Sequence, residues 1–304
     1  MSKKRGDRYD GTLVRKQDSM HAFMPYMLGS RVENEAVMNE SIDLTAVNEY
    51  LAEKNKDNPE FKYTLFHVIT AAIAKTIYMR PLMNRFIMGG RYYDRNQISL
   101  AFTVKKQFSD KSGEALAICR IKDNTAPIQQ IRDQIYKQIT SIRKDNVNDD
   151  ATDIMDTITK LPPCGIRLVV KLLKFLDRHG WLPQDIAKAD PYHATVFVSN
   201  LGSIKLHATY HHLADWGTNS FFVVIGEKYK KLKIMEDDST EIREFLDLGI
   251  TVDERIADGY YYAQTVKVLR AILEDPYLLE RPMDYEYINE RKDAPNVPDK
   301  SPMA

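Results

Sequence analysis

The sequence predicts one large domain of the α+β (mixed α/β) class. Its 304 residues, of which 43% are hydrophobic, are enough to bury a full core. Apolar runs typical of strands and amphipathic runs typical of helices follow one another without the regular alternation of a doubly wound sheet. Several helical runs also place their apolar residues at spacings of three and four, which is one face of a helix. Strands and helices therefore belong to one mixed fold.

The first third of the chain predicts extended structure followed by two helices. Residues 23–44 read as extended segments that lead into a short helix near 44–54. The segment YTLFHVITAAIAKTIYMRP (63–81) predicts a long helix, because its large apolar residues form a stripe at helical spacing. Thr64 is placed to cap this helix. Pro81 is placed to end it, since proline lacks the backbone N–H that a helix interior needs.

The rest of the chain predicts five strands and three further helices. The strands are expected at 98–104, 114–121, 194–200, 220–227 and 245–253. The helices are expected at 128–145, 164–180 and 260–276, and the first of them carries five isoleucines on one face.

The lysine-rich run KYKKLK (228–233) predicts a solvated loop. Residues 277–304 are rich in charge and proline, so we expect a domain at 1–276 and a peripheral or disordered tail at 277–304.

Charge and cysteine usage exclude several classes of protein. Lysine plus arginine number 43, as do aspartate plus glutamate, so the net charge is zero and predicts no general attraction to nucleic acid or to an anionic membrane. The charged N-terminus has no apolar run behind it, and no segment approaches 18 uninterrupted apolar residues. We therefore expect neither a secretory leader nor a membrane span. Cys119 and Cys164 are too few for a disulfide framework or a cysteine-based zinc site, which favours a cytoplasmic protein without a metal.

Four stretches, read in order, resemble one known family. They are LFHVITAAIAKTIYMRPLMNRFI (65–87), ISLAFTV to GEALAICRIKD (98–123), FVSNLGS (197–203) and DERIADG (253–259). The third is similar to the Ser-Asn-Leu-Gly turn, and the fourth to the motif Asp-His-Arg-x-x-Asp-Gly, of the catalytic domain of dihydrolipoyl acyltransferases of 2-oxoacid dehydrogenase complexes. Chloramphenicol acetyltransferase shares that fold. The resemblance covers about residues 12–276, and it departs from the family at Glu254, which replaces the motif histidine.

The resemblance implies a two-layer sandwich, with helices on one side of a mixed sheet, that assembles as a homotrimer. The implied active site is a channel at the subunit interface, with a coenzyme A thioester as co-substrate and a small-molecule acyl acceptor. The motif histidine accepts the proton of the attacking group, and a hydroxyl of the Ser-Asn-Leu-Gly side of the neighbouring subunit stabilises the oxyanion. These roles fall on Glu254 and on Ser203 or Ser199. Asp258 is implied to pair with an arginine, and Gly259 to permit a tight turn.

These residues also have structural interpretations. In the Ser-Asn-Leu-Gly segment the side chains, that of Asn200 included, can bond their own backbone in a turn. Asp258 equally suits an ordinary helix N-terminus. His211 and His212, in YHHLADWG, fall near the substrate channel in the family, so either can supply a proton-handling group; packed or surface histidines are the alternative. No carboxylate at ligand spacing accompanies them, so no metal site is predicted. His193 is assigned no role.

Glu254 decides between functions. A thiol with a pKa of about 8.5 is matched better by a histidine near 6.5 than by a free carboxyl near 4.3, so the replacement costs about 3 kcal/mol, or roughly a hundredfold in rate. The chain is thus either an acyltransferase with an atypical base or a catalytically inactive binding or scaffolding trimer; a thioester hydrolase is a third alternative.

The run 228–233 can contact the coenzyme phosphates. The chain shows no lipoyl segment or Ala/Pro-rich linker, so we expect no incorporation into a 2-oxoacid dehydrogenase complex.

Overall fold

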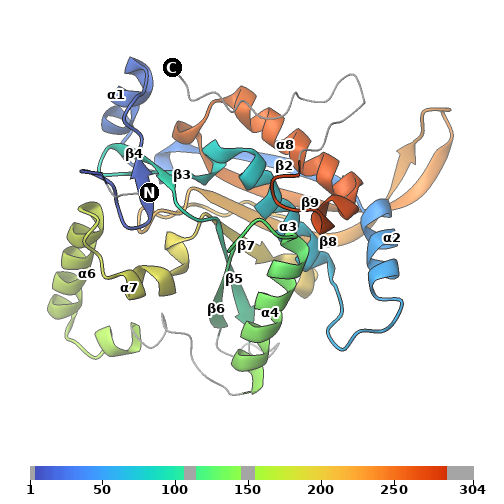
Figure 1. Ribbon diagram of the computed structural model, residues 1–304, viewed down its shortest axis with the longest axis horizontal. Coiled ribbons are helices and arrows are strands. Elements are labelled where there is room, and N and C mark those ends of the chain that lie inside the picture. The colour runs from blue at the N-terminus through green and yellow to red at the C-terminus, as the bar shows by residue number, and fades with distance from the viewer. Residues whose placement is uncertain (1–3, 106–113, 145–154, 286–304) are drawn as a thin grey trace.

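Six strands form a central mixed sheet in the order β2-β9-β8-β7-β5-β6, in a computed structural model that describes residues 4–105, 114–144 and 155–285 (Figure 1). A smaller sheet has the order β1-β4-β3. The strands are β1 Gly11–Leu13, β2 Glu35–Asp43, β3 Arg85–Met88, β4 Arg91–Arg95, β5 Ser99–Lys105, β6 Glu114–Arg120, β7 Val196–Asn200, β8 Phe221–Ile234 and β9 Thr240–Asp253. The α-helices are α1 Ser19–Met27, α2 Thr45–Lys54, α3 Leu65–Met79, α4 Pro127–Lys144, α6 Pro163–Arg178, α7 Gln184–Ala189 and α8 Gly259–Glu274. The predicted mixed α/β class is confirmed.

The central sheet combines parallel and antiparallel pairs. β2 lies antiparallel to β9, with Glu35 opposite Asp253, and β8 and β9 form a long hairpin. β7 lies parallel to both β5 and β8. Because β7 is covered on both faces, its residues read as the continuous apolar run VFV at 196–198. This is why hydrophobicity alone located the central strands.

The far end of the β8–β9 hairpin extends beyond the body of the fold (Figure 1). The run 228–233, predicted as a solvated loop, lies in β8 there, so that prediction is wrong. Lys228 pairs with Glu244 at 2.9 Å, and Lys233 pairs with Asp43 at 2.7 Å. Backbone pairing with β9 holds these lysines in a strand although their side chains face solvent. Two of the four lysines are therefore already paired with carboxylates.

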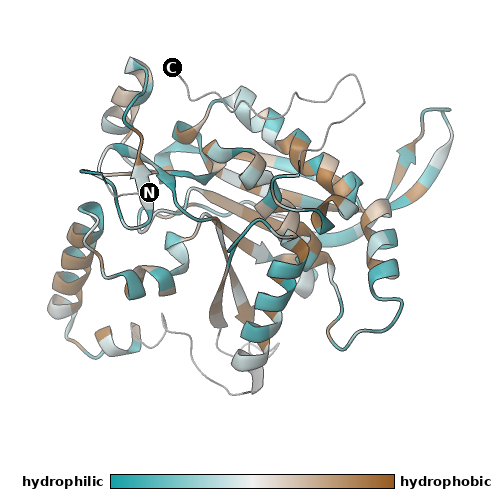
Figure 2. Cartoon of the chain, viewed as in Figure 1, coloured by the Kyte–Doolittle hydropathy of each residue, from teal (hydrophilic) through white to brown (hydrophobic). Residues whose placement is uncertain are grey.

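Helices α3, α4 and α8 pack on one face of the sheet and close the main core, and the side of α4 that faces outward is hydrophilic (Figure 2). Thr64 caps α3, as predicted. His67 N donates to its hydroxyl, while Thr64 N donates to His67 Nδ1 at 2.9 Å. The helix ends before Pro81. The ammonium of buried Lys75 donates to Pro282 O at 2.6 Å, and burial lowers the pKa of Lys75 to about 8.

The opposite face of the sheet carries a smaller cluster and is crossed by residues 205–214, which we call the crossing segment. Its backbone runs directly over β8 and β9 at two glycines. A Cβ on Gly226 would lie 2.5 Å from Ala208 N, and a Cβ on Gly249 would lie 2.1 Å from Thr209 O. Neither distance is possible for a real side chain, so both strands need glycine where the segment crosses.

The first helix corrects the prediction that residues 23–31 are extended. Instead, α1 includes most of them and holds Pro25 in its interior. Asp18 caps the helix, since its carboxylate accepts hydrogen bonds from Met20 N and His21 N, both at 3.0 Å. Proline at this position removes one backbone bond, and the sequence pattern alone read that residue as a break.

The core also continues beyond the predicted domain end at residue 276. Leu278 and Leu279 are buried in a short 3-10 helix, Pro276–Glu280, and Met283 is fully buried. Met283 N donates to Asn124 O at 3.1 Å. The first part of the predicted peripheral tail is therefore core, which corrects that boundary. Residues 286–304 lie outside the described part of the chain.

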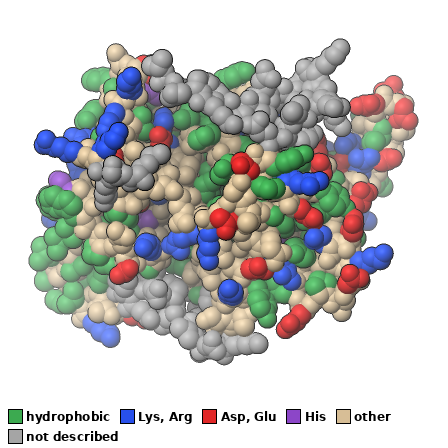
Figure 3. All heavy atoms as spheres, viewed as in Figure 1, with side chains coloured by type: hydrophobic (Ala, Val, Ile, Leu, Met, Phe, Trp, Pro, Cys, Tyr) green, Lys and Arg blue, Asp and Glu red, His purple; other side chains and the backbone are tan. Residues whose placement is uncertain are grey.

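Helix α6 presents large apolar side chains to solvent. Leu168, Leu172 and Phe175 are 69%, 54% and 51% exposed, and Figure 3 shows hydrophobic side chains gathered at the edge where α6 lies. The helix is attached to the body through Asp177, which is buried near its C-terminal end. Gly180 follows in a left-handed conformation with φ 71°, which is common for the residue just after a helix.

Candidate functional site

The motif DERIADG begins where β9 leaves the sheet. Asp253, the last residue of β9, is fully buried, whereas the following Glu254 is exposed at the start of a 3-10 helix, Glu254–Ile256. Arg255 turns back and forms a bidentate pair with Asp253 at 2.8 and 2.7 Å. Burial opposes the charge of Arg255, but the bonds to Asp253 outweigh it and raise the pKa of the guanidinium. Tyr262 Oη donates to Asp253 O at 2.8 Å, which ties α8 to the same point.

Two predicted roles within the motif are wrong. Asp258 forms no ion pair with an arginine among the residues that the structure describes; its carboxylate caps α8 by accepting from Tyr261 N at 2.7 Å. The buried carboxylate that pairs with arginine is Asp253. Gly259 has no left-handed φ, and a Cβ placed on it meets nothing within 4 Å. Ordinary helix-terminus geometry therefore explains both Asp258 and Gly259.

The Ser-Asn-Leu-Gly turn follows β7 as the 3-10 helix Leu201–Ile204. Asn200 Oδ1 accepts from Ser203 N at 3.3 Å, and Ser203 Oγ donates to Asn200 O at 2.7 Å. These bonds match the structural interpretation of the turn. Ser199 is half-buried in β7 and is paired with Val224 of β8. Because strand side chains alternate, Ser199 shares the face of Phe197, which is the face that the crossing segment covers.

The crossing segment carries both predicted histidines. His211 stacks on Phe222 of β8, with ring centroids 4.2 Å apart and planes at 7°, and His212 stacks on His211. His211 Nδ1 bonds His212 O, and His212 Nδ1 bonds Leu213 O, both at 2.8 Å. Leu213 N then donates to Glu35, the residue opposite Asp253 in the sheet. The histidines are thus brought to the end of the sheet where Glu254 leaves it.

Ser203 and Glu254 are not brought together within one chain. The Ser203 turn lies against Gly226 of β8, whereas Glu254 comes two residues after Val252, the partner of Phe221. At about 3.3 Å per residue, the five positions along β8 and the two beyond Val252 amount to roughly 23 Å. A site that uses both residues therefore needs them from two subunits.

Sequence reasoning missed a buried ionic network around His193. The imidazole lies between Asp177 of α6, at 3.2 Å, and Asp190, at 3.0 Å. Arg8 Nη2 donates to Asp177 Oδ1 at 2.8 Å, and Trp216 Nε1 donates to Asp190. Burial disfavours the imidazolium, but the bonds to Asp177 and Asp190 outweigh it and raise the pKa of His193 to about 9. The Asp-x-x-His spacing of residues 190–193 was the one local signal for this network.

A second missed feature is an open cavity of about 410 Å³ beside the motif. Its lining includes residues of α1, the β3–β4 hairpin and α6. Its lining includes Arg31 and Arg255, two buried arginines whose closest shared carboxylate is Asp253. No sequence pattern marked this cavity, because its lining residues come from five separate segments of the chain.

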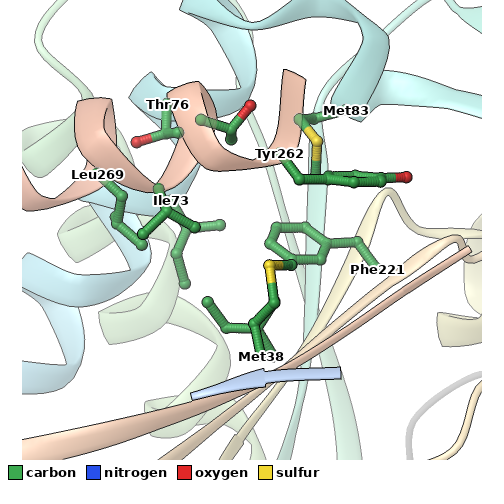
Figure 4. Close-up of a pocket in the computed structure, with 10 residues that line it drawn as sticks. Met38, Ile73, Thr76, Met83, Phe221, Tyr262 and Leu269 are labelled. Atoms are coloured by element: carbon green, nitrogen blue, oxygen red, sulfur yellow. The ribbon is translucent and has the colours of Figure 1, made fainter. Parts of the chain in front are cut away.

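A smaller void lies in the core between α3, α8 and the sheet (Figure 4). It has a volume of about 20 Å³, and apolar groups of Met38, Met83, Phe221 and Leu269 point into it. A space of this size is close to that of a single water molecule and has no charged side chain in its lining. It is a packing defect of the core and not a site of chemistry.

Within the described ranges, no group of three or more histidine, cysteine, aspartate or glutamate side chains is arranged to hold a metal ion. In the same part of the chain, no helix combines the length and the apolar character needed to cross a bilayer.

Comparison with known proteins identifies the fold. No protein-family model and no curated protein sequence matches the chain. Among solved structures, a probable dihydrolipoamide acetyltransferase from Listeria monocytogenes 4b F2365 has a TM-score of 0.55 and 16% identity, over 89% of this chain and 96% of that one. Dihydrolipoamide acetyltransferase of Azotobacter vinelandii gives 0.56 and 14%, over 88% and 94%. Chloramphenicol acetyltransferase gives 0.53 and 11%, over 86% and 99%.

This chain shares their fold. The predicted resemblance to dihydrolipoyl acyltransferase catalytic domains and to chloramphenicol acetyltransferase is confirmed at that level. The alignment spans nearly the full length of each neighbour, so the shared part is the whole domain. At 11 to 16% identity the likeness concerns architecture alone, because a fold does not carry its chemistry with it.

Proposed function

We propose that this protein is a homotrimeric acyltransferase that moves an acyl group from a coenzyme A thioester to a small acceptor. The observation that supports it most is the full-length fold match to two dihydrolipoamide acetyltransferases and to chloramphenicol acetyltransferase. The motif DERIADG also lies at the end of β9 next to the crossing segment, so an exposed carboxylate and two histidines occupy one region. Together they supply proton-handling groups at one end of the sheet.

In the proposed reaction Glu254 accepts the proton of the acceptor's thiol or hydroxyl. The acceptor atom attacks the thioester carbonyl carbon, and the resulting oxyanion receives a hydrogen bond from Ser203 or Ser199 of a neighbouring subunit. Collapse of this intermediate breaks the carbon–sulfur bond, and the proton returns from Glu254 to the departing thiolate. Asn200, His211 and His212 line the proposed channel, and one of the histidines can assist the proton transfer.

The trimer is proposed because one chain leaves the site incomplete. Ser203 and Glu254 lie roughly 23 Å apart along the sheet of one subunit. The turn and the start of the crossing segment expose Ile204, Leu206 and Tyr210, which is the apolar surface that a subunit contact would cover. Subunit contact would also exclude water from the site, which strengthens the hydrogen bonds and charge interactions within it.

Turnover assays of three variants test this proposal. Thiol release from acetyl- and longer acyl-coenzyme A is measured with and without thiol, amine and hydroxyl acceptors, for the wild type, Glu254→Gln and Glu254→His. Glu274→Gln is the matched control, because Glu274 is an exposed carboxylate at the last residue of α8. We expect acceptor-dependent turnover in the wild type and control, a loss of roughly a hundredfold or more in Glu254→Gln, and recovery in Glu254→His.

Other outcomes assign other functions. A silent wild type with activity only in Glu254→His would identify a binding or scaffolding trimer that has lost its catalysis. Acid release without any acceptor would identify a thioester hydrolase.

Mixing inactive subunits tests the interfacial site. Glu254→Gln and the double variant Ser199→Ala/Ser203→Ala are each expected to be inactive. Trimers that contain both kinds of subunit would hold some interfaces with an intact base and intact hydroxyls. Activity that returns on mixing supports a shared site, whereas inactive mixtures of verified trimers would show that each subunit works alone.

A further inference from the structure

The open cavity beside the motif is a built pocket between five segments of the chain. It is lined by residues 29–31 after α1, by the β3–β4 hairpin tip with Gly89 and Gly90, by α6, by residues 215–217 and by Arg255. Both hairpin glycines have left-handed φ, 61° and 78°. A Cβ on Gly90 would lie 2.7 Å from the Tyr26 ring of α1, so the tip fits closely against that helix. The volume of about 410 Å³ lies in the usual range for small-molecule sites.

Cations outnumber carboxylates around this cavity. Four cations line it: Arg31, Lys174, Arg178 and Arg255. Two carboxylates line it, Asp177 and Asp215, and both already have partners. Asp177 pairs with Arg8 and His193, while Asp215 accepts from Ser30 Oγ at 2.9 Å and from Arg31 N at 2.8 Å. Neither carboxylate neutralises the two cations that α6 contributes.

Those two cations have no partner in the described part of the chain. Lys174 and Arg178 are exposed, lie one turn apart on the same side of α6, and form no hydrogen bond or ion pair with any residue described there. The Arg178 side chain lies against the hairpin tip, since a Cβ on Gly89 would meet its Cγ at 3.4 Å and its Nε at 3.7 Å. Both side chains are thus free to bind an anion in the cavity.

Deeper in the cavity, the charge of Arg31 is only partly compensated. Arg31 is buried and donates mainly to carbonyl oxygens, those of Ala214 and, at 3.3 Å, Gly217. Its Nε forms no hydrogen bond, and the nearest carboxylate oxygen, on Asp253, is 3.8 Å away. Burial lowers the pKa of Arg31, which is the sign of a charge short of compensation. Arg255 pairs closely with that same Asp253 carboxylate, so Arg31 has only a distant share of it.

We propose that this cavity binds a small organic dianion, a phosphate monoester or a dicarboxylate, through Lys174 and Arg178. Lys174 and Arg178, which no carboxylate of the described residues neutralises, supply two positive charges, and these match a dianion. Guanidinium and ammonium groups bind both phosphates and carboxylates strongly when water is partly excluded. The proposal goes beyond acyl transfer and does not depend on it, because binding can be measured without turnover.

Calorimetric titration at constant ionic strength tests the site with two probes, inorganic phosphate and succinate. The double variant Lys174→Gln/Arg178→Gln removes the two free cations. Arg167→Gln/Lys171→Gln is the matched control, because it removes two exposed cations of the same helix that do not line the cavity. We expect saturable binding by the wild type and control for at least one probe, and a loss of roughly tenfold to a hundredfold in the cavity variant.

The outcomes separate the possible sources of the anion. Preference for phosphate or for succinate identifies the kind of dianion. Competition by coenzyme A would assign the phosphate to that co-substrate, and its failure would assign the dianion to a separate ligand. No saturable binding by the wild type would overturn the proposal. Equal losses in the cavity variant and in the control would overturn it as well, since they would reflect general attraction to the helix.

Discussion

Raising the pH from about 6.5 to about 8 is expected to lower the free energy of unfolding through one buried side chain, His193. The imidazole is held between Asp177 and Asp190, so the folded protein keeps its proton up to a pKa of about 9. The unfolded chain releases that proton near the ordinary value of about 6.5. The stabilisation that protonated His193 gains from Asp177 and Asp190 is therefore complete below pH 6.5. It is lost as the pH rises toward 9.

The magnitude follows from proton linkage. Between the two pKa values the folded state binds one proton more than the unfolded state, so each pH unit costs about 1.4 kcal/mol. A window of about 1.5 units, up to pH 8, gives a loss of about 2 kcal/mol. The window ends there because the pKa of Lys75 is lowered to about 8 by burial, and stability from that group rises with pH above this value. It begins at 6.5 because His67, whose pKa burial lowers to about 4, acts in the opposite sense below it.

Urea unfolding at several pH values within this window measures the effect. Tryptophan fluorescence is a suitable signal, because the Trp216 ring lies 5.8 Å from His193. Asp190→Asn keeps a hydrogen-bonding group of the same size but removes one of the two carboxylates, so its slope with pH is expected to be smaller. A wild type whose stability does not change across the window, or an equal slope in both proteins, would refute the assignment of a charged His193.

Three further predictions test local geometry. Gly249→Ala forces the crossing segment off the sheet and is expected to lower the melting temperature clearly, while Gly259→Ala, which meets open space, leaves it unchanged within error; calorimetry of both decides. Asp258→Ala removes the cap of α8 and is expected to cost about 1 kcal/mol in urea unfolding, and no change would contradict the capping role. In the native protein iodoacetamide is expected to modify exposed Cys164 but not Cys119, whose burial raises its pKa to about 12; peptide mass spectrometry distinguishes them.

Several elements were predictable because their signal is local. The stripe of α3, its Thr64 cap and the stop at Pro81 all lie within one short segment, and the structure has them as predicted. The central strands were found because burial on both faces makes them continuously apolar. Local signals misled where packing overruled them. Pro25 lies inside α1, and the lysine run 228–233 pairs as a strand.

The sequence by itself determined the fold class, the order of most elements and the family resemblance, because periodicity and short motifs are properties of neighbouring residues. It did not determine which charges meet. Asp253 and not Asp258 pairs with arginine, and His193 joins Asp177. These contacts, like the four cations around the cavity, unite segments far apart in the chain. Only the tertiary structure decides them, because burial and distance set the strength of an ionic interaction and neither is written in local sequence.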